Sequence, residues 1–277
     1  MNENDLEDAC FTWLSELGYE VLTGDDVSPG GGDQDREHYS DVVLSSRLRA
    51  ALEKFNPTCT ATEIDEAFNK VAGFSSQSLV DGNKTLYDWL RNGVEVDRMG
   101  ADGVPTVIRL KVFSSGSDND FVAVRQFTIH GKKVRRPDVI LMVNGIPLVV
   151  IELKNPADLN ADIEAAYNQI QNYKHDIPKF FQYNLLNIIS DGTSAHYGSL
   201  TADFERFTPW RLLDGEKVRG KTELELQVMV KGLLNPAILM DFFFNFVAFG
   251  GESGQNTFKI IAQWHQYHGG IYSPGRG

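Results

Sequence analysis

The sequence predicts a mixed α/β (α+β) fold, in which a mixed β-sheet is flanked by helices. Apolar residues recur at helical spacing over residues 4–17 and again over residues 158–174. Between these segments, two apolar runs, 139–143 and 148–151, flank the dipeptide Asn144-Gly145. The chain has 277 residues, and 42% of them are hydrophobic. It can therefore bury the core of one large domain, or of one domain and part of another.

The part of the chain up to residue 92 is predicted to be mostly helical. Residues 4–17 give one apolar face and stop at Gly18, after which residues 19–22 can begin a strand. Residues 24–40 are Gly-rich but lack the Lys-Ser/Thr of a phosphate-binding loop, so we expect a mobile insertion. The following helices are expected to form an all-α insertion at about 41–92 that packs beside the sheet: 41–55, 62–71 and 85–91.

After Val94 the apolar residues take the period of a strand. Residues 107–113 and 121–129 both alternate between apolar and polar positions, as half-exposed strands do. The loop 114–119 is expected to join them as an antiparallel hairpin that feeds the mixed sheet.

The runs 139–143 and 148–151 predict a second hairpin. Neither run alternates, so both faces should be buried, and Asn144-Gly145 tolerates the positive φ of a tight turn. A two-residue turn would set Asp138 opposite Ile151, and Glu152 would point the other way. A three-residue loop, or an equivalent bulge, would instead set Asp138 opposite Glu152. We expect this second register, because the chemistry that these residue types suggest needs the two carboxylates together.

Asp138 enters the hairpin, and Glu152 and Lys154 leave it on one face. Buried charges are costly unless they pair with each other or with a metal. Carboxylate oxygens suit Mg²⁺, with Mn²⁺ as a substitute, and such an ion neutralises a phosphate and lowers the pKa of a bound water. Asp138 and Glu152 are therefore candidate metal ligands, and Lys154 would orient the attacking water or hold the phosphate. The structural alternative is an ion-pair cluster at the end of a sheet.

A helix over 158–174 is expected to follow, with Gln169 and Tyr173 on one face because they are four residues apart. The residues 184–190 predict a buried strand, and 195–199 predict a last strand at the edge of the sheet.

Residues 206–277 are expected to form a linker and a helical segment beyond a first domain at 1–205. Helices are predicted over 223–234, 236–246 and 256–268. The Phe-rich second helix is too apolar to remain in water, so it should pack into the first domain or the start of the next. No G-x-x-x-x-G-K-[ST] phosphate loop occurs in the sequence.

The pattern Pro137-Asp138, an apolar hairpin, then Glu152-Leu153-Lys154 resembles the PD-(D/E)xK nuclease site. The extended pattern is more specific: Arg136-Pro-Asp, Ile151-Glu-Leu-Lys-Asn-Pro, then Gln169-x-x-x-Tyr173. It is similar to the RecB-type nuclease domain of the R subunits of type I restriction endonucleases. The likeness runs from the first helix to the C-terminal end.

The resemblance implies a restriction-endonuclease-like sheet and an Mg²⁺-dependent endonuclease that acts on double-stranded DNA. It further implies a restriction complex with methyltransferase and specificity subunits, and it places the DNA recognition site in another subunit. Residues 256–268 are similar to the segment that leads into the family's helicase motor. We therefore expect a fragment that keeps the nuclease, while ATP binding and translocation belong to the full-length protein.

The resemblance also implies roles for further residues. The carbonyl of Leu153 would coordinate the metal, and Glu7 on the first helix would approach it. The alternative for Glu7 is a solvated helix face, for which its neighbours Glu3 and Asp8 are equally available. Gln169 and Tyr173 would lean toward the DNA backbone or Lys154; the alternative is ordinary pairing on a helix surface.

The formal net charge of −12 is opposite to that of a simple duplex-binding protein. Contact with DNA must therefore be local or supplied by partners. The local candidates are four basic residues just before Asp138, which would hold flanking phosphates: Lys132, Lys133, Arg135 and Arg136. The alternative for these residues is a solvated edge strand.

Only two cysteines occur, Cys10 and Cys59, which are too few for a disulfide framework. The acidic N-terminus lacks the apolar stretch of a signal peptide, and no apolar run reaches membrane-spanning length. We expect a soluble cytoplasmic protein without a membrane partner. Two other functions compete with the endonuclease: an inactive nuclease-like scaffold that docks in the restriction complex, and a stand-alone exonuclease or resolvase.

Overall fold

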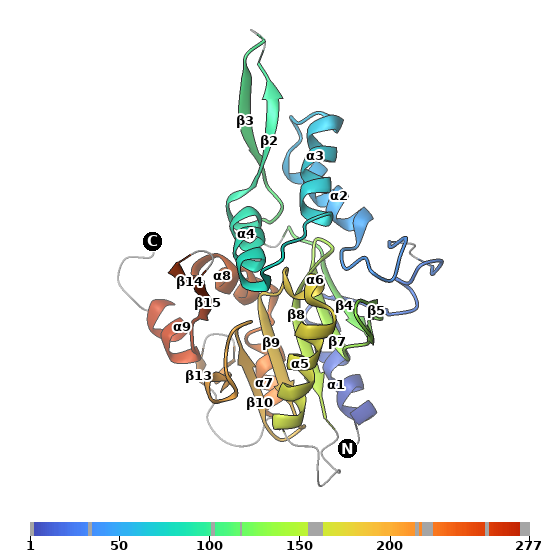
Figure 1. Ribbon diagram of the computed structural model, residues 1–277. Helices are drawn as coiled ribbons and strands as arrows, with labels where there is room; N and C mark the ends of the chain where they lie inside the picture. The colour runs from blue at the N-terminus through green and yellow to red at the C-terminus, as the bar shows by residue number, and fades with distance from the viewer. Residues whose placement is uncertain are drawn as a thin grey trace.

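The computed structural model describes residues 3–32, 35–100, 103–116, 118–154, 163–213, 216–217, 224–252 and 255–271. Its centre is a seven-stranded sheet with the order β1-β4-β7-β8-β9-β10-β11 (Figure 1). The pairs β1–β4 and β8–β9 are parallel and the others are antiparallel, so the predicted mixed sheet is confirmed. The strands are β1 (Glu20–Thr23), β4 (Phe121–Arg125), β7 (Val139–Val143), β8 (Ile146–Leu153), β9 (Leu186–Ser190), β10 (Ala195–Gly198) and β11 (Thr208–Pro209).

The hairpin of β7 and β8 is fully buried, as the two apolar runs predict. Asn144 and Gly145 form a two-residue turn with positive φ values of 51° and 78°, and Val143 pairs with Ile146. The expected three-residue loop is therefore wrong. The bulge named as its equivalent is present, however, and it brings Val139 opposite Ile151, which is the register that the sequence analysis preferred.

Helices cover both faces of the sheet (Figure 1). Helix α1 (Glu3–Glu16) packs against β1 and β8 and against α7 (Glu225–Lys231), whereas α5 (Ile163–Asp176) packs against β8 and β9. Leu6, Cys10 and Leu14 of α1 are fully buried because they recur at helical spacing on the side that meets the sheet. The expected start of α5, before residue 163, lies outside the described residues.

The predicted α-helical insertion consists of α2 (Ser45–Phe55), α3 (Ala61–Ala72) and α4 (Leu79–Asn92). Helix α2 begins later than predicted, because the Leu44 amide donates to the Gly145 carbonyl (2.9 Å) and ties residues 41–44 to the hairpin turn. Thr60 and Glu63 form a capping box at the start of α3. Helix α4 is longer than predicted and starts after the capping residue Ser78.

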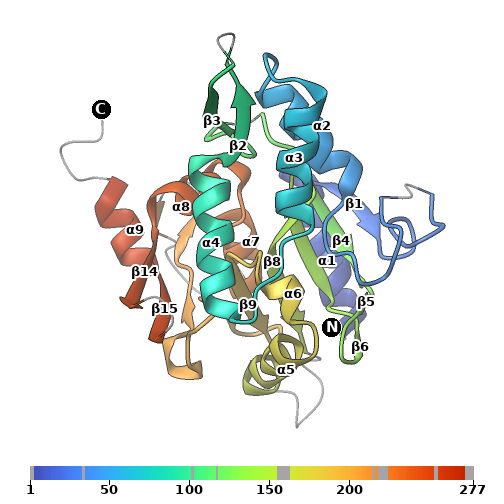
Figure 2. The ribbon, with the colours of Figure 1, turned by 45° about the horizontal axis from the view of Figure 1, so that its top comes forward.

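The strand β3 (Pro105–Leu110) pairs with β2 (Val94–Met99) in a separate two-stranded ribbon beside α3 (Figures 1 and 2). The predicted hairpin between 107–113 and 121–129 is therefore wrong. Its second strand, β4, is buried between β1 and β7 instead. Alternation marks both segments as strands, but it carries no information about which strand each one pairs with.

The Gly-rich segment 24–40 was expected to be a mobile insertion, but several of its described residues are packed against the rest of the fold. Val27 and Arg36 are buried, and the Arg36 guanidinium lies 3.8 Å from the centre of the Phe127 ring. Arg36 Nε also donates to the Val27 carbonyl (2.8 Å). The segment therefore packs onto the end of β4.

The C-terminal region adds α7, α8 (Pro236–Asn245), a hairpin of β14 (Val247–Glu252) and β15 (Gln255–Ile261), and α9 (Trp264–Ile271). Phe242 and Phe243 are buried, so the Phe-rich helix packs inward as predicted. The single helix expected over 256–268 is wrong. Phe258 (45% exposed) and Ile260 (48%) flank the buried Lys259 (3%), which is the two-residue alternation of a strand.

The smaller elements connect these parts: β5 (Ile129–His130), β6 (Val134–Arg135), α6 (Pro178–Phe181), a 3₁₀ turn (Phe204–Arg206), β12 (Leu212–Leu213) and β13 (Glu216–Lys217). No single helix among the described residues is long and apolar enough to cross a membrane; α7 and α8 pass that test only as a pair, and they are bent by 77°.

Candidate metal centre

Asp138 and Glu152 meet where the buried hairpin ends. Asp138 precedes Val139 and Glu152 follows Ile151, so the bulged register makes the two acidic residues neighbours. The Leu153 amide donates to Asp138 Oδ2 (2.8 Å), which ties the aspartate directly to the Glu152-Leu153 segment. Glu152 itself is only 2% exposed.

Lys154 joins this group directly after the end of β8. Its Nζ lies 2.7 Å from Glu152 Oε1, and its amide donates to the Ser190 carbonyl of β9 (2.9 Å). Burial alone would lower the pKa of Lys154, but the carboxylates of Glu152 and Asp138 outweigh it and raise this pKa. Lys154 is therefore a protonated donor at neutral pH.

The carboxylates of the hairpin are held in an environment that disfavours their charge. Burial, together with the nearby charge of Glu152, raises the pKa of Asp138 to about 8. Burial likewise raises the pKa of Glu152, although Lys154 opposes this. Without an added cation, Asp138 is thus largely protonated at neutral pH.

One oxygen of Glu152 has no partner. Within the described part of the chain, Oε2 of Glu152 is buried and accepts no hydrogen bond. The Tyr173 hydroxyl approaches the same carboxylate closely enough to lower its pKa, but it leaves Oε2 unpaired. Such an orphaned buried acceptor is costly, and a bound cation would remove the cost.

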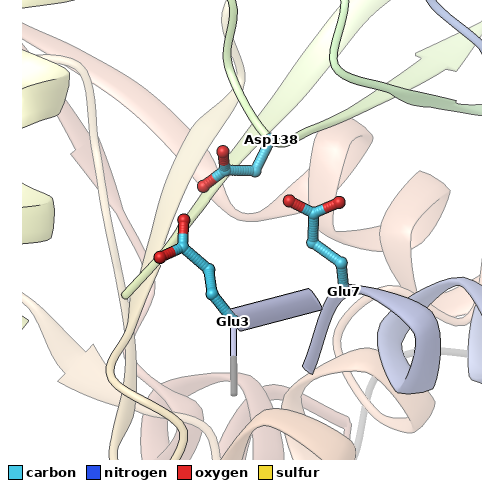
Figure 3. A group of neighbouring side chains, drawn as sticks. All are labelled: Glu3, Glu7 and Asp138. Carbon is cyan, nitrogen blue, oxygen red and sulfur yellow. The ribbon is translucent and has the colours of Figure 1, made fainter. Parts of the chain in front are cut away.

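Helix α1 brings two more carboxylates to this point. Figure 3 shows Glu3 and Glu7 directed toward Asp138, and one oxygen from each of the three lies within 4.8 Å of the others. Glu7 is 2% exposed, and burial raises its pKa. The nitrogen Nε2 of Gln126 lies 3.4 Å from both Glu7 oxygens, and Gln126 has a positive φ of 54°.

The structure thus places Glu7 beside Asp138, which is where the family resemblance led us to expect this residue of the first helix. It also brings in Glu3 and Gln126, which the sequence analysis did not assign to the site. The spacing of four residues between Glu3 and Glu7 is a signal for Glu3, because residues at this spacing share one face of a helix. No signal in the sequence marks Gln126.

Gln169 and Tyr173 lie together on α5, with Gln169 Nε2 donating to the Tyr173 hydroxyl (3.1 Å). Tyr173 is buried, and its pKa is raised by that burial and by the neighbouring Glu152. The pair therefore faces the β8 side of the centre, and Tyr173 keeps its proton.

The four basic residues fall into two groups. Lys132, Lys133 and Arg136 are exposed in and beside the ribbon of β5 and β6. Arg135 instead forms an ion pair with the buried Asp176 of α5, with Nε 2.8 Å from Oδ2. Three of the four are thus open to an external ligand, and Arg135 ties the ribbon to α5.

The donor set suits a hard divalent cation. Carboxylate oxygens, a backbone carbonyl and a buried unpaired Oε2 are the ligands that Mg²⁺ and Mn²⁺ accept, whereas no cysteine or histidine belongs to the described acidic cluster.

Comparisons with known proteins identify the family of the chain. The family model described as "Type I restriction enzyme R protein N terminus" matches residues 1–206. The endonuclease subunit of the type I restriction enzyme HindI from Haemophilus influenzae is 40% identical over 274 residues, which cover 97% of this chain and 26% of the relative. The putative MjaIXP endonuclease subunit from Methanocaldococcus jannaschii is 26% identical, covering 95% of this chain and 26% of the relative.

A third relative, the SauCOLORF180P endonuclease subunit from Staphylococcus aureus, is 35% identical over 72% of this chain and 19% of its own length. The chain therefore spans about a quarter or less of the curated relatives named here. Because the family model covers well over half of the 277 residues, the chain belongs to the family of type I restriction enzyme R protein N termini.

Proposed function

We propose that this chain is the metal-dependent nuclease domain of a type I restriction enzyme R subunit, an Mg²⁺-dependent endodeoxyribonuclease that hydrolyses phosphodiester bonds in double-stranded DNA. The observation that carries the proposal is the pairing of Asp138 and Glu152 at the end of a bulged hairpin, with an unpaired buried oxygen on Glu152. The raised pKa of Asp138, about 8, also supports the proposal, because strongly perturbed carboxylates cluster at functional sites.

Asp138, Glu152 and the Leu153 carbonyl would hold the cation, with Glu7 approaching from α1. When bound, Mg²⁺ (or Mn²⁺) supplies charge neutralisation for the phosphate and lowers the pKa of a bound water. Lys154 stays protonated, so it serves as a donor that holds the scissile phosphate or orients the water, and it does not serve as a base. The Tyr173 hydroxyl accepts a hydrogen bond from Gln169 and lies close to the Glu152 carboxylate, so it would help to hold that carboxylate in place.

DNA would reach this centre along the ribbon of β5 and β6. Lys132, Lys133 and Arg136 are exposed there, and they stand immediately before Asp138 in the chain. Phosphate contacts of this kind position a duplex without selecting its sequence. With a net charge of −12, the chain would bind DNA through this small region and only weakly in isolation.

Full-length relatives are about four times as long as the region they share with this chain. We therefore assign ATP-driven translocation to the part of such a protein outside this region. In the same proposal, the cytoplasmic R subunit acts in a complex with methyltransferase and specificity subunits, and another subunit holds the recognition site.

A second function also needs a direct test, because the ion pair of Lys154 with Glu152 fits a purely structural role as well. A catalytically silent scaffold could keep this ion pair for stability alone. The two functions differ in metal binding and in DNA cleavage.

The test combines calorimetry with a nicking assay on supercoiled plasmid. The wild-type chain and the Glu152→Gln and Asp138→Asn variants are titrated with Mg²⁺ and Mn²⁺, and Glu16→Gln serves as a matched control at the far end of α1. Metal binding and nicking in the wild type and control, with both lost in the two site variants, support the nuclease. Equal behaviour of the wild type and Asp138→Asn would reject it in favour of the scaffold.

A further inference from the structure

The ribbon of β5 and β6 is fixed to the C-terminal turn of α5 through both backbone and side chain. The Lys132 amide donates to the Asp176 carbonyl (2.8 Å). The neighbouring Gly131 lies so close that an added Cβ would stand 2.3 Å from the same carbonyl oxygen, so this approach requires glycine. Arg135 completes the contact, because its Nε lies 2.8 Å from Asp176 Oδ2 and its Nη2 donates to the same oxygen. The segment that presents the exposed lysines is therefore expected to move together with the end of α5.

Arg135 contacts two residues on one face of α5. Tyr173 and Asp176 are three residues apart, so they are neighbours on the helix surface. The Arg135 guanidinium binds the Asp176 carboxylate, and its Cζ also lies 5.9 Å from the centre of the Tyr173 ring. A guanidinium within about 6 Å of an aromatic ring centre is attracted by the electrons of the ring face. Arg135 therefore holds Tyr173 from the side of the ribbon.

Tyr173 continues this line of contacts to the candidate metal centre. Its hydroxyl accepts from Gln169 Nε2 (3.1 Å) and approaches the Glu152 carboxylate closely. Tyr173 is 3% exposed, so its ring cannot shift without displacing the groups packed around it. Coupling between separate parts of a protein is carried by such unbroken chains of packed and hydrogen-bonded groups. Here the chain runs from the ribbon through Arg135 and Tyr173 to Glu152.

A second arginine makes the same kind of ion pair far from the centre. Arg98 of β2 binds Glu63 of α3, with Nε 2.6 Å from Oε1 and Nη2 2.8 Å from Oε2. Like Arg135, it joins a two-stranded ribbon to a helix, and its carboxylate partner is buried. Its further hydrogen bond goes to Cys59 Sγ (3.4 Å), and β2 and α3 lie at the opposite end of the molecule from the start of α1 (Figure 1). Arg98 is therefore a matched control for a purely structural role.

We propose that Arg135 is a positioning residue for DNA cleavage: it passes the position of a duplex held on the ribbon of β5 and β6 to Tyr173, and Tyr173 in turn sets the Glu152 carboxylate. This inference rests on the proposed nuclease function and adds to it a residue that acts without touching the phosphodiester. A lysine would also neutralise Asp176, whereas the planar guanidinium pairs with a carboxylate and covers an aromatic ring at the same time. Replacing Arg135 by lysine therefore separates the two roles.

The first experiment compares Arg135→Lys with the control Arg98→Lys. Nicking of supercoiled plasmid with Mg²⁺ gives kcat and KM, fluorescence anisotropy gives the Kd for a duplex, and urea denaturation shows that each variant is folded. Arg135→Lys should lower kcat by about 10-fold or more, because a small misplacement of a reacting group is costly, and should leave KM and Kd nearly unchanged. Arg98→Lys should leave all three quantities unchanged.

The second experiment observes Tyr173 directly and needs no cleavage. The nine tyrosines are replaced by 3-fluorotyrosine, and the ¹⁹F resonance that is absent in Tyr173→Phe belongs to Tyr173. A duplex is added at low salt in the presence of EDTA, so that no metal ion bridges it to the carboxylates. At saturation the Tyr173 resonance should shift in the wild type and in Arg98→Lys, and it should keep its position in Arg135→Lys.

The outcomes separate this inference from the proposed function. A wild-type kcat in Arg135→Lys, or equal losses of kcat in Arg135→Lys and Arg98→Lys, would overturn the positioning role and leave the nuclease assignment intact. A bound duplex that does not shift the Tyr173 resonance of the wild type, or that shifts it equally in Arg135→Lys, would overturn it as well. Absence of nicking by the wild type with Mg²⁺ and with Mn²⁺ would instead contradict the proposed function, and the ¹⁹F shift would still show whether the ribbon is linked to Tyr173.

Discussion

Asp138 and Glu152 are neighbours because Leu148 is an extra residue in β8. Val143 pairs with Ile146 at the turn, yet Val139 pairs with Ile151, and the difference of one position is taken up beside Leu148. A hairpin of the same length without this bulge would send the two carboxylates to opposite faces of the sheet. The chemistry of the centre therefore depends on the exact pairing of a fully buried hairpin, and on the turn that fixes it.

The turn residue Asn144 is the first test of that dependence. It has a φ of 51° and is buried; its Oδ1 accepts from the Asp120 amide (2.7 Å) and its Nδ2 donates to the Val112 carbonyl (2.8 Å). Asn144→Ala removes both bonds and keeps the strained φ, so the free energy of unfolding should fall by about 2–4 kcal/mol. Urea denaturation measures this loss.

The exposed Asn92, at the end of α4, provides the control for that measurement. Asn92→Ala should change the free energy of unfolding by no more than about 0.5 kcal/mol. Similar losses in the two variants would show that the turn contributes nothing special to stability.

The raised pKa of Asp138 predicts a pH-dependent stability in the absence of metal. Its folded-state pKa is about 8, above the ordinary value of 3.8. The folded chain therefore holds this proton more tightly than the unfolded chain between about pH 4 and pH 8, and the resulting stability is lost as the pH rises through that window. For one proton the slope is at most about 1.4 kcal/mol per pH unit.

Chelator-treated protein, unfolded by urea at pH 5.5, 6.5 and 7.5, reports that slope. Asp138→Asn should flatten it and should be more stable than the wild type at pH 7.5. Saturating Mg²⁺ should also raise the wild-type stability at pH 7.5, because metal binding favours the ionised carboxylate. A wild-type slope that Asp138→Asn leaves unchanged would assign the proton to another group.

Lys154 should be needed for cleavage and dispensable for metal binding. Its Nζ contacts Glu152 Oε1 (2.7 Å), and its pKa is raised, so it is a positive charge fixed beside the carboxylates that we propose as metal ligands. Lys154→Met removes that charge, and plasmid nicking should fall by at least about 100-fold. Calorimetry should still detect Mn²⁺ binding, since Asp138 and Glu152 remain.

The exposed Lys111 offers a control substitution of the same kind. Lys111→Met should leave both nicking and Mn²⁺ binding unchanged. Loss of Mn²⁺ binding in Lys154→Met would mean that Lys154 orders the ligands and does not act on the phosphate.

Local patterns predicted much of this structure, and long-range pairing accounts for most errors. The hairpin of β7 and β8 is visible in the sequence because its two strands and turn are contiguous and apolar. The partner of β3 is not visible, because alternation at Val107 fits either β2 or β4 equally well. The helix predicted over 256–268 failed for a related reason: Phe258, Ile261 and Trp264 recur at helical spacing, although residues 258–261 lie in β15 and Trp264 begins α9.

The same limit applies to the candidate centre. Asp138, Glu152 and Lys154 lie on one hairpin, so sequence spacing and turn geometry suffice to bring them together. Gln126 contacts Glu7 only through the packing of α1 against the sheet, and 119 positions separate the two residues in the chain. Its positive φ is a property of the folded backbone, which the residue type does not reveal.

The basic residues before Asp138 should separate into DNA-binding and structural roles. Lys132 and Lys133 are exposed, whereas Arg135 pairs with the buried Asp176. The double change Lys132→Ala and Lys133→Ala should weaken duplex binding and reduce the salt slope of log K by up to about 1.8, since each phosphate contact contributes about 0.9. Its stability should remain within about 0.5 kcal/mol of the wild type.

Arg135→Ala should behave differently, because it leaves the carboxylate of Asp176 buried without its guanidinium partner. The free energy of unfolding should fall by more than in the double lysine variant, with a smaller effect on the salt slope. Fluorescence anisotropy at several salt concentrations and urea denaturation measure the two quantities on the same samples. If the double lysine variant keeps the wild-type salt slope, DNA binds to another surface, because the loss of a phosphate contact reduces the slope. This conclusion holds even if the variant is less stable than the wild type.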